Sequence, residues 1–211
     1  MTSETKPLWR LLYLVLGMVT FAGPGLAQRP TMTISEVQLR MAMRAAWEAN
    51  AGWTRMYIVS SLAGLTDVNR VNSRLLESAD GVADALRPYY PYPVAESLAK
   101  QFKRQVLLTV ALVTAARNGD SLQTAAASAN WSAGSDSLTQ FLVRTNPNLP
   151  SGKLGDLLHA YQDRTWRQIA ARTRQDWFAD VVACDQTDIE ARAIADALSA
   201  GIVKQFPDRF K

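Results

Sequence analysis

Residues 33–64 read TISEVQLRMAMRAAWEANAGWTRMYIVSSLAG, and this stretch predicts one long amphipathic helix. Thr33 and Glu36 have the spacing of a capping box, which satisfies backbone N–H groups at a helix start. Apolar residues then recur every three or four positions, the period of a single helix face. Gly64 follows at a point where helices commonly end. The side chains expected to form this stripe are Met43, Ala46, Trp47, Tyr57, Ile58 and Leu65.

The remaining chain repeats this pattern of a cap, an apolar stripe and a stop. A bend near residues 174–176 separates the last two helices, or they form one long helix. No stretch alternates polar and apolar residues with β-branched enrichment, so no sheet is expected. The further helices are expected from Asp67 to Leu86 or Arg87, from near Pro93 to Asn118, from Asp120 or Ser121 to just before Asn146, from Ser151 onward, and from about Asp176 to Phe206.

Short loops make neighbouring helices antiparallel. We therefore predict an all-α fold, an antiparallel up-and-down helical bundle with about six helical segments. Residues 28–211 are expected to form this bundle as a single domain.

The first 27 residues have the features of a signal peptide. Lys6 and Arg10 provide a basic start, and Leu11–Ala22 is an apolar run shorter than the roughly 20 residues of a membrane helix. Gly25-Leu26-Ala27 supplies the small residues of a cleavage site. We expect a periplasmic or secreted mature chain that starts at Gln28 and has no membrane span. An uncleaved amino-terminal anchor is the alternative.

The composition excludes several kinds of chemistry. Of the 211 residues 48% are hydrophobic and 20% charged, a balance typical of globular proteins. Cys184 is the only cysteine and His159 the only histidine, so neither an internal disulfide nor a zinc site of His and Cys can form. The formal net charge of +4 is too small and too dispersed to indicate nucleic-acid binding.

Polar residues interrupt the apolar stripes close to the middle of three helices. Each interruption is a pair four residues apart, and so the two members share one helix face. On the last helix two carboxylates border a stripe formed by Trp177, Val181, Cys184, Ala191, Leu198 and Ile202. The resulting candidate ligand-binding layer consists of Asn50, Thr54, Gln105, Thr109, Tyr161, Thr165, Asp185 and Asp188.

Such a layer has two interpretations. A buried polar group without a partner costs about 1–3 kcal/mol, so groups at matching depth should satisfy one another or surround a ligand. The first interpretation is a closed, water-bridged hydrogen-bond layer that fixes helix register. The second is a pocket for a small molecule. In both we expect four of these side chains to converge, namely Asn50, Gln105, Tyr161 and Asp185.

Other chemistry-bearing residues have simpler interpretations. Cys184 lies on an apolar stripe without a base nearby in sequence, and we expect an inert thiol there. His159 lies off the stripe of its helix and should be a surface residue. Residues 152–155 (GKLG) lack the first glycine and the preceding strand of a phosphate loop. We therefore expect no catalytic set, no metal ligands and no cofactor.

Several short strings resemble a family of uncharacterised exported bacterial helical-bundle proteins, some of which carry a misplaced acetylglutamate kinase label. The resemblance runs from about residue 40 to the end, and its carboxy-terminal string is the most specific. The sequence has neither the phosphate loop nor the α/β pattern of a kinase, so it does not support that label. The matching strings are Trp53-Thr54-Arg55, Arg87-Pro88-Tyr89-Tyr90, Asn118-Gly119-Asp120, Asn146-Pro147-Asn148 and residues 201–207 (GIVKQFP) with Arg209-Phe210.

The resemblance implies a metal site on facing helices, from which this chain departs. In that family, histidines tend to occupy the positions of Asn50, Gln105 and Tyr161, and acidic residues those of Ala111 and Gln168. Histidine is also common there at position 188 or 190. This chain keeps only Asp185 of the set, with Asp188 and Glu190 at the other two positions. The resemblance thus implies a site location, while these residues imply that the metal chemistry is lost.

Three functions follow as hypotheses. The first, which we favour, is an exported, non-enzymatic bundle that binds a small ligand or a protein partner. The second is a metal-dependent bundle enzyme that would use the carboxylates of Glu48, Asp185, Asp188 and Glu190, although the Glu-x-x-His motifs usual in such enzymes are missing. The third is a structural, envelope-associated protein.

Overall fold

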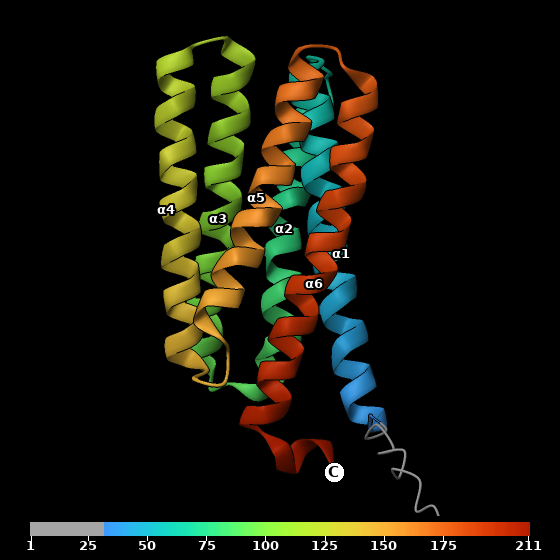
Figure 1. Ribbon diagram of the computed structural model, residues 1–211, viewed down its shortest axis with the longest axis vertical. Helices are drawn as coiled ribbons and strands as arrows, with labels where there is room; N and C mark the ends of the chain where they lie inside the picture. Colours follow the sequence, from blue (N-terminus) through green and yellow to red (C-terminus); the bar gives the residue numbers. More distant parts are fainter. Residues whose placement is uncertain (1–31) are drawn as a thin grey trace, which may run out of the picture. The chain divides into compact units, whose positions relative to one another are not determined.

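The computed structural model describes residues 32–211, and this part of the chain contains six α-helices and two short 3₁₀-helices (Figure 1). Between Met32 and Lys211 there is no strand, and the prediction of an all-α bundle is confirmed. The expected signal peptide, its cleavage site and the mature start at Gln28 lie outside the described residues. The elements are α1 (Ile34–Leu62), α2 (Val68–Leu86), η1 (Arg87–Tyr89), α3 (Tyr92–Asn118), α4 (Ser121–Thr145), α5 (Ser151–Thr173), α6 (Trp177–Gln205) and η2 (Pro207–Phe210).

The side chains of Thr33, Asp120 and Asp176 cap α1, α4 and α6, whereas Asp67 at the start of α2 forms no side-chain cap hydrogen bond. The backbone N–H of Glu36 donates to the Thr33 hydroxyl at 3.3 Å, but the Glu36 carboxylate pairs with Arg40 instead of completing the capping box. Asp176 accepts from the N–H of Ala179 at 3.0 Å and so caps α6. Gln175 has a φ of 59°, a left-handed conformation that ends the helical path. The turn therefore divides α5 from α6, which are two separate helices.

Successive helices pack side by side around the bundle, and three of them, α1, α3 and α5, also meet at its centre. Each helix packs against the one before it and the one after it, and α6 packs against α1. In addition α1, α3 and α5 contact one another. The odd-numbered helices therefore line the centre, and α2, α4 and α6 each cover the groove between two of them. Side chains in the middle of α1, α3 and α5 can consequently meet.

Cross-helix pairs show how adjacent helices run. Between α1 and α6, salt bridges join Arg44 to Asp196 and Arg55 to Asp180, so residue numbers rise on one helix as they fall on the other. Between α3 and α4, Gln105 bonds Ser135 and Thr109 bonds Trp131 in the same opposed order. The helices α1 and α6 are therefore antiparallel, and so are α3 and α4. In Figure 1 the chain rises and falls alternately from one helix to the next.

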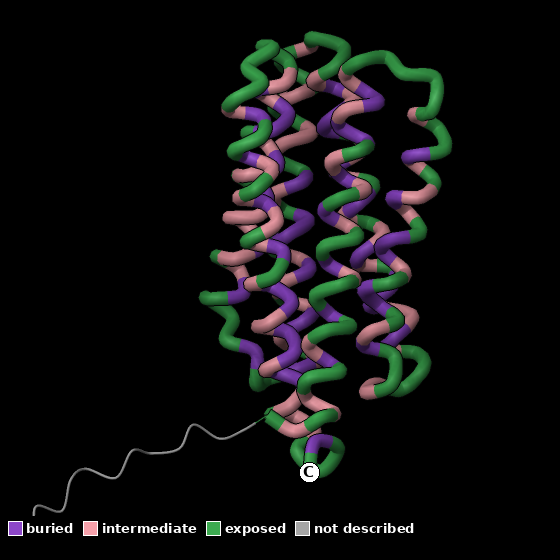
Figure 2. Tube along the Cα trace, turned by 90° about the vertical axis from the view of Figure 1, so that its right-hand side faces the viewer, coloured by how far each residue is buried: buried purple, intermediate pink, exposed green. Residues whose placement is uncertain are grey.

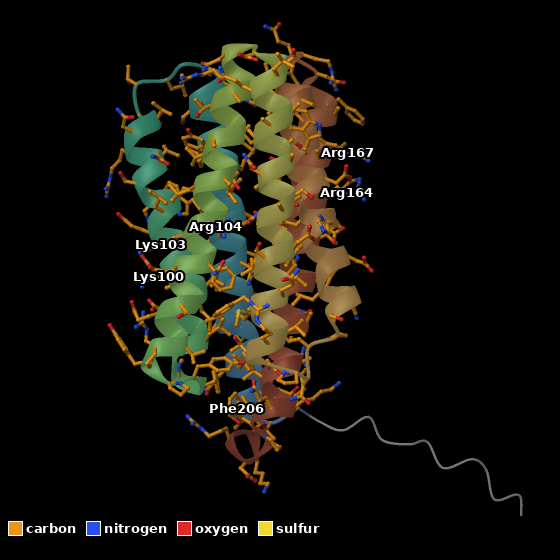
Figure 3. The ribbon with its side chains drawn as sticks, turned by 90° about the vertical axis from the view of Figure 1, so that its left-hand side faces the viewer. Lys100, Lys103, Arg104, Arg164, Arg167 and Phe206 are labelled. Atoms are coloured by element: carbon orange, nitrogen blue, oxygen red, sulfur yellow. The ribbon has the colours of Figure 1, made fainter. Side chains whose placement is uncertain are left out.

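Buried residues recur along every helix, separated by exposed ones (Figure 2). Charged side chains such as Lys100, Lys103 and Arg104 project outward from α3 (Figure 3). Within residues 32–211, no helix is both long and apolar enough to cross a membrane. The largest fully buried side chains include Met43, Ile58, Leu98, Leu112, Ile169 and Leu198.

The predicted stripe of α6 is wrong in its first half. Trp177 and Val181 are each 55% exposed, and the buried side is formed by Asp180, Ala183 and Thr187. Asp180 can take an interior position because two arginines neutralise it. Leu65, which was expected to continue the stripe of α1, lies in the loop after that helix and is 44% exposed.

Candidate functional site: a polar chamber between α1, α3 and α5

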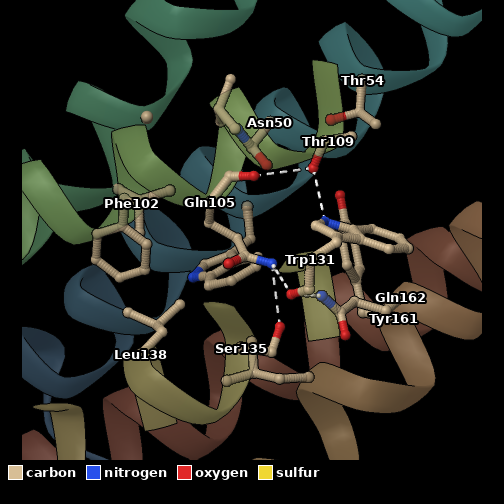
Figure 4. Close-up of a pocket in the computed structure, with 15 residues that line it drawn as sticks. Asn50, Thr54, Phe102, Gln105, Thr109, Trp131, Ser135, Leu138, Tyr161 and Gln162 are labelled. Carbon is tan, nitrogen blue, oxygen red and sulfur yellow. Dashed lines mark hydrogen bonds between the residues drawn. The ribbon is translucent and has the colours of Figure 1, made fainter. Parts of the chain in front are cut away.

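The three central helices enclose a small cavity at mid-height, which we call the chamber (Figure 4). Polar side chains of all three helices reach it, and α4 adds Trp131 and Ser135 from outside the central three. Aromatic rings and aliphatic side chains complete its wall. The polar residues that line it are Asn50, Thr54, Gln105, Thr109, Ser135, Tyr161 and Gln162.

The chamber is small. The space that the centre of a water molecule could occupy is about 40 Å³. One water needs roughly 10–15 Å³ on this measure, so the chamber has room for roughly three waters or for one molecule of a few heavy atoms. A drug-sized ligand, which needs a pocket of roughly 300 Å³ or more, does not fit.

A chain of hydrogen bonds joins α3 to α4 and α5 beside the chamber (Figure 4). The Trp131 indole N–H donates to the Thr109 hydroxyl at 2.9 Å, and that hydroxyl donates to the backbone carbonyl of Gln105 at 3.0 Å. The Gln105 amide donates to the Ser135 hydroxyl at 3.1 Å. The Gln162 amide donates to the carbonyl of Trp131 at 2.8 Å. These bonds fix the orientation of the indole and of both glutamine side chains.

A glycine allows α3 and α4 to approach closely here. A Cβ atom at Gly134 would lie 2.4 Å from Leu108 Cδ1 and 2.8 Å from Gln105 Oε1, closer than non-bonded atoms come. The missing side chain lets Gln105 reach across to α4. Asn50 on α1 is held in another way, since its amide donates to the Ser78 hydroxyl of α2 at 2.9 Å.

Two buried polar atoms of the chamber residues have no hydrogen-bond partner among residues 32–211. They are the hydroxyl of Tyr161 and the indole Nε1 of Trp47. Burial raises the pKa of Tyr161 to about 12, and the neighbouring Thr54 hydroxyl opposes this only in part. Tyr161 therefore stays neutral and can donate a hydrogen bond. An unpaired buried group of this kind costs about 1–3 kcal/mol, which a water or a ligand with an acceptor oxygen would recover.

The rest of the wall is aromatic and aliphatic. The Trp47 ring meets Phe102 and Tyr161 edge-on, each with a centroid distance of 6.0 Å. Of the residues that the structure describes, no charged side chain lines the chamber. Because a charged ligand would find no counter-ion here and would lose its hydration, the chamber suits a neutral molecule.

Five of the eight predicted layer residues line the chamber, two from α1, two from α3 and Tyr161 from α5. Thr165 is fully buried but donates to the carbonyl of Tyr161 at 2.8 Å and is not part of the wall. Asp185 is exposed and Asp188 is half-buried, and neither lines the chamber. The expectation that Asp185 joins the others was wrong, because α6 is an outer helix and turns Ala183 and Thr187 inward instead.

The sequence analysis missed Trp131, Ser135 and Gln162 as chamber residues. Gln162 follows the predicted Tyr161 directly, and adjacent helix positions point about 100° apart, so the i, i+4 pair of Tyr161 and Thr165 did not include it. Trp131 is the only aromatic residue in a segment of small polar residues and alanines, 121–137, and this contrast was an available signal.

A second polar cluster, also missed, lies near the turn between α5 and α6. The Asp180 carboxylate is 2% exposed and accepts hydrogen bonds from Arg55 of α1 and Arg172 of α5. Burial alone would raise the pKa of Asp180, but the hydrogen bonds and charges of the two arginines outweigh it and hold the pKa below its ordinary value. We call these three residues the Asp180 cluster.

Neither Cys184 nor His159 lines the chamber. Burial raises the pKa of the Cys184 thiol, which keeps it in the less reactive protonated form. His159 is partly exposed and pairs with Asp136 at 2.8 Å. Within residues 32–211, no three His, Cys, Asp or Glu side chains gather closely enough to hold a metal ion. The metal-dependent hypothesis thus has no ligand set in this part of the chain.

Comparison with known proteins adds no relative: no family model matches the sequence, and neither does any curated protein or solved structure.

Proposed function

We propose that this protein is an exported, non-enzymatic binding protein that holds a small uncharged molecule in the chamber. The observation that carries the proposal is the pair of buried, unpartnered polar groups, the Tyr161 hydroxyl and the Trp47 indole N–H, beside a cavity of about 40 Å³. The proposal of export depends on the basic and apolar features of residues 1–27.

The chemistry of the wall defines the class of ligand. Both unpartnered groups can donate a hydrogen bond, so the ligand should carry an acceptor oxygen. The volume limits it to a few heavy atoms, and the uncharged wall favours a neutral molecule. Small amides, ketones and alcohols meet these conditions.

The test uses acetamide and its charged analogue acetate, titrated calorimetrically into the purified protein. We expect saturable binding of acetamide and none of acetate. Tyr161→Phe should weaken acetamide binding with little loss of stability, because within residues 32–211 no group lies in hydrogen-bond geometry to the hydroxyl and only the nearby Thr54 and Thr165 hydroxyls interact with it weakly. Tyr92→Phe, which changes a tyrosine that is 69% exposed, is the matched control and should leave binding unchanged.

Failure of acetamide to bind, together with no small molecule in an extract of the purified protein, would contradict the proposal. The chamber would then be the closed, water-bridged layer. Export is tested separately by the intact mass of the mature protein, which should begin at Gln28.

A further inference from the structure

A larger pocket opens at the end of the bundle where α1, α3 and α5 terminate. Its volume is about 340 Å³, within the range of ligand sites of known proteins. It is lined by Arg117 of α3, Arg172 of α5, Gln175 of the turn and Trp177 of α6. Leu62 at the end of α1 and the following Ala63 also line it. It shares no lining residue with the chamber.

The Asp180 cluster gives this pocket an excess of positive charge. Arg55 Nη2 and Arg172 Nη1 lie 2.7 Å and 2.8 Å from the same oxygen, Asp180 Oδ2. Arginine is always protonated, so two cations share one carboxylate and the cluster carries a net charge of +1. The Arg172 side chain is 19% exposed and lines the pocket, while its Nη1 is bound to Asp180.

Arg117 adds a second cation. It is exposed, and within residues 32–211 it forms no ion pair. Three helices contribute their C-terminal ends to the pocket and only α6 contributes its N-terminal end, so the helix dipoles offset part of the positive charge of the arginines.

Trp177 provides the apolar part of the same pocket. The Arg172 guanidinium lies over its ring, 5.4 Å from the centroid, which holds the cation in a fixed orientation. The indole is nevertheless 55% exposed. A planar apolar wall thus stands beside two cationic groups.

We propose that this pocket binds a small organic oxyanion, a carboxylate or a phosphate, whose charged group lies between Arg117 and Arg172 and whose apolar part packs on Trp177. Guanidinium groups form paired hydrogen bonds with both kinds of oxyanion, so their geometry suits either head group. The site is independent of the proposed function of the chamber.

The test titrates benzoate, phenyl phosphate and inorganic phosphate into the purified protein by calorimetry at low ionic strength. We expect saturable binding of benzoate or phenyl phosphate, weakened by added salt. The one that binds more tightly identifies the head group. Arg117→Gln should weaken binding about tenfold or more, since a charge-assisted pair is lost.

The matched control is Arg104→Gln. Arg104 is also an exposed arginine of α3 without an ion pair in the described residues, and it projects outward more than three turns from Arg117 (Figure 3). This variant should bind as the wild type does. Trp177→Leu should weaken the binding of benzoate and phenyl phosphate but not the binding of inorganic phosphate.

Two results would overturn the proposal. One is the absence of saturable binding for all three probes at low salt. The other is an equal loss of affinity in Arg117→Gln and Arg104→Gln, which would indicate diffuse attraction to a basic surface. Because Tyr161→Phe alters only the chamber, unchanged oxyanion binding in that variant separates this site from the proposed function.

Discussion

The chamber lies at mid-height among α1, α3 and α5 and holds only neutral polar groups, whereas the Asp180 cluster buries one carboxylate between two guanidiniums near the α5–α6 turn. In the chamber neutral hydrogen bonds hold the polar side chains, and two buried atoms have no partner within residues 32–211. In the cluster every charge is held by a charge-assisted bond. The helices α1 and α5 thus bury polar groups both as neutral hydrogen bonds and as ion pairs. Mutations in the ion-paired cluster should change the free energy of unfolding more than mutations in the chamber.

The largest effect should come from Asp180→Ala. Removal of one partner leaves two poorly solvated guanidiniums without their carboxylate, which costs about 3–5 kcal/mol of unfolding free energy. Chemical denaturation monitored by circular dichroism measures it. Asp196→Ala is the control, because its salt bridge to Arg44 is solvent-exposed and should cost less than about 1 kcal/mol. Similar losses in the two variants would show that the cluster is no stronger than a surface pair.

Acid should weaken the same cluster in a defined pH range. The pKa of Asp180 is lower in the folded protein than its ordinary value of 3.8, so the ionised form stabilises the fold above that value. This stabilisation is lost as the pH falls through the folded pKa. The stability gap between the wild type and Asp180→Asn should therefore be constant near neutral pH and shrink below about pH 4. A gap that stays constant in acid would contradict the assigned ion pairing.

A smaller effect is expected in the chamber from Thr109→Val. The variant keeps the shape of the side chain but removes the acceptor of the Trp131 indole N–H, at a cost of about 1–3 kcal/mol. Thr139→Val is the matched control: its hydroxyl also bonds the carbonyl four residues earlier but receives no indole. Equal stability changes in the two variants, by urea denaturation, would mean that the Trp131 bond contributes little.

The two regions also differ in how far the sequence could predict them. The three i, i+4 pairs identified the chamber because neutral polar residues interrupt otherwise apolar stripes, and helical geometry places each pair on one face. The central position of α1, α3 and α5 could not be read in the same way, since it depends on which helices pack together. The chamber volume depends on side-chain packing, and a sequence pattern does not encode it.

The Asp180 cluster was missed because apolar periodicity ranks residues by hydrophobicity. In the first half of α6, that ranking favours Trp177 and Val181, which are exposed, over Asp180, which is buried. A stripe of small residues, Ala183, Thr187 and Ala191, continues the face of Asp180 and would have located it. The partners in α1 and α5 could not be assigned, because the sequence does not specify which arginine meets which acid.

The smallest effect should come from a second carboxylate of α6, and its sign should be opposite. Asp188 lies about two turns after Asp180 and is half-buried without an ion pair among the described residues. Burial raises the pKa of Asp188, Arg192 opposes this, and the charges of Asp185 and Glu48 add to it. A carboxyl group whose folded pKa is raised favours the fold while protonated, so this contribution is lost as the pH rises through the folded pKa.

Asp188→Asn should therefore make the protein slightly more stable than the wild type at pH 7 and leave it unchanged in acid. Asp156→Asn, at an exposed position of α5 without an ion pair in residues 32–211, is the control and should match the wild type at both pH values. Urea denaturation at the two pH values compares all three proteins. A wild type more stable than Asp188→Asn at neutral pH would mean that Asp188, like Asp180, is stabilised by a cation, and the contrast between the two carboxylates of α6 would disappear.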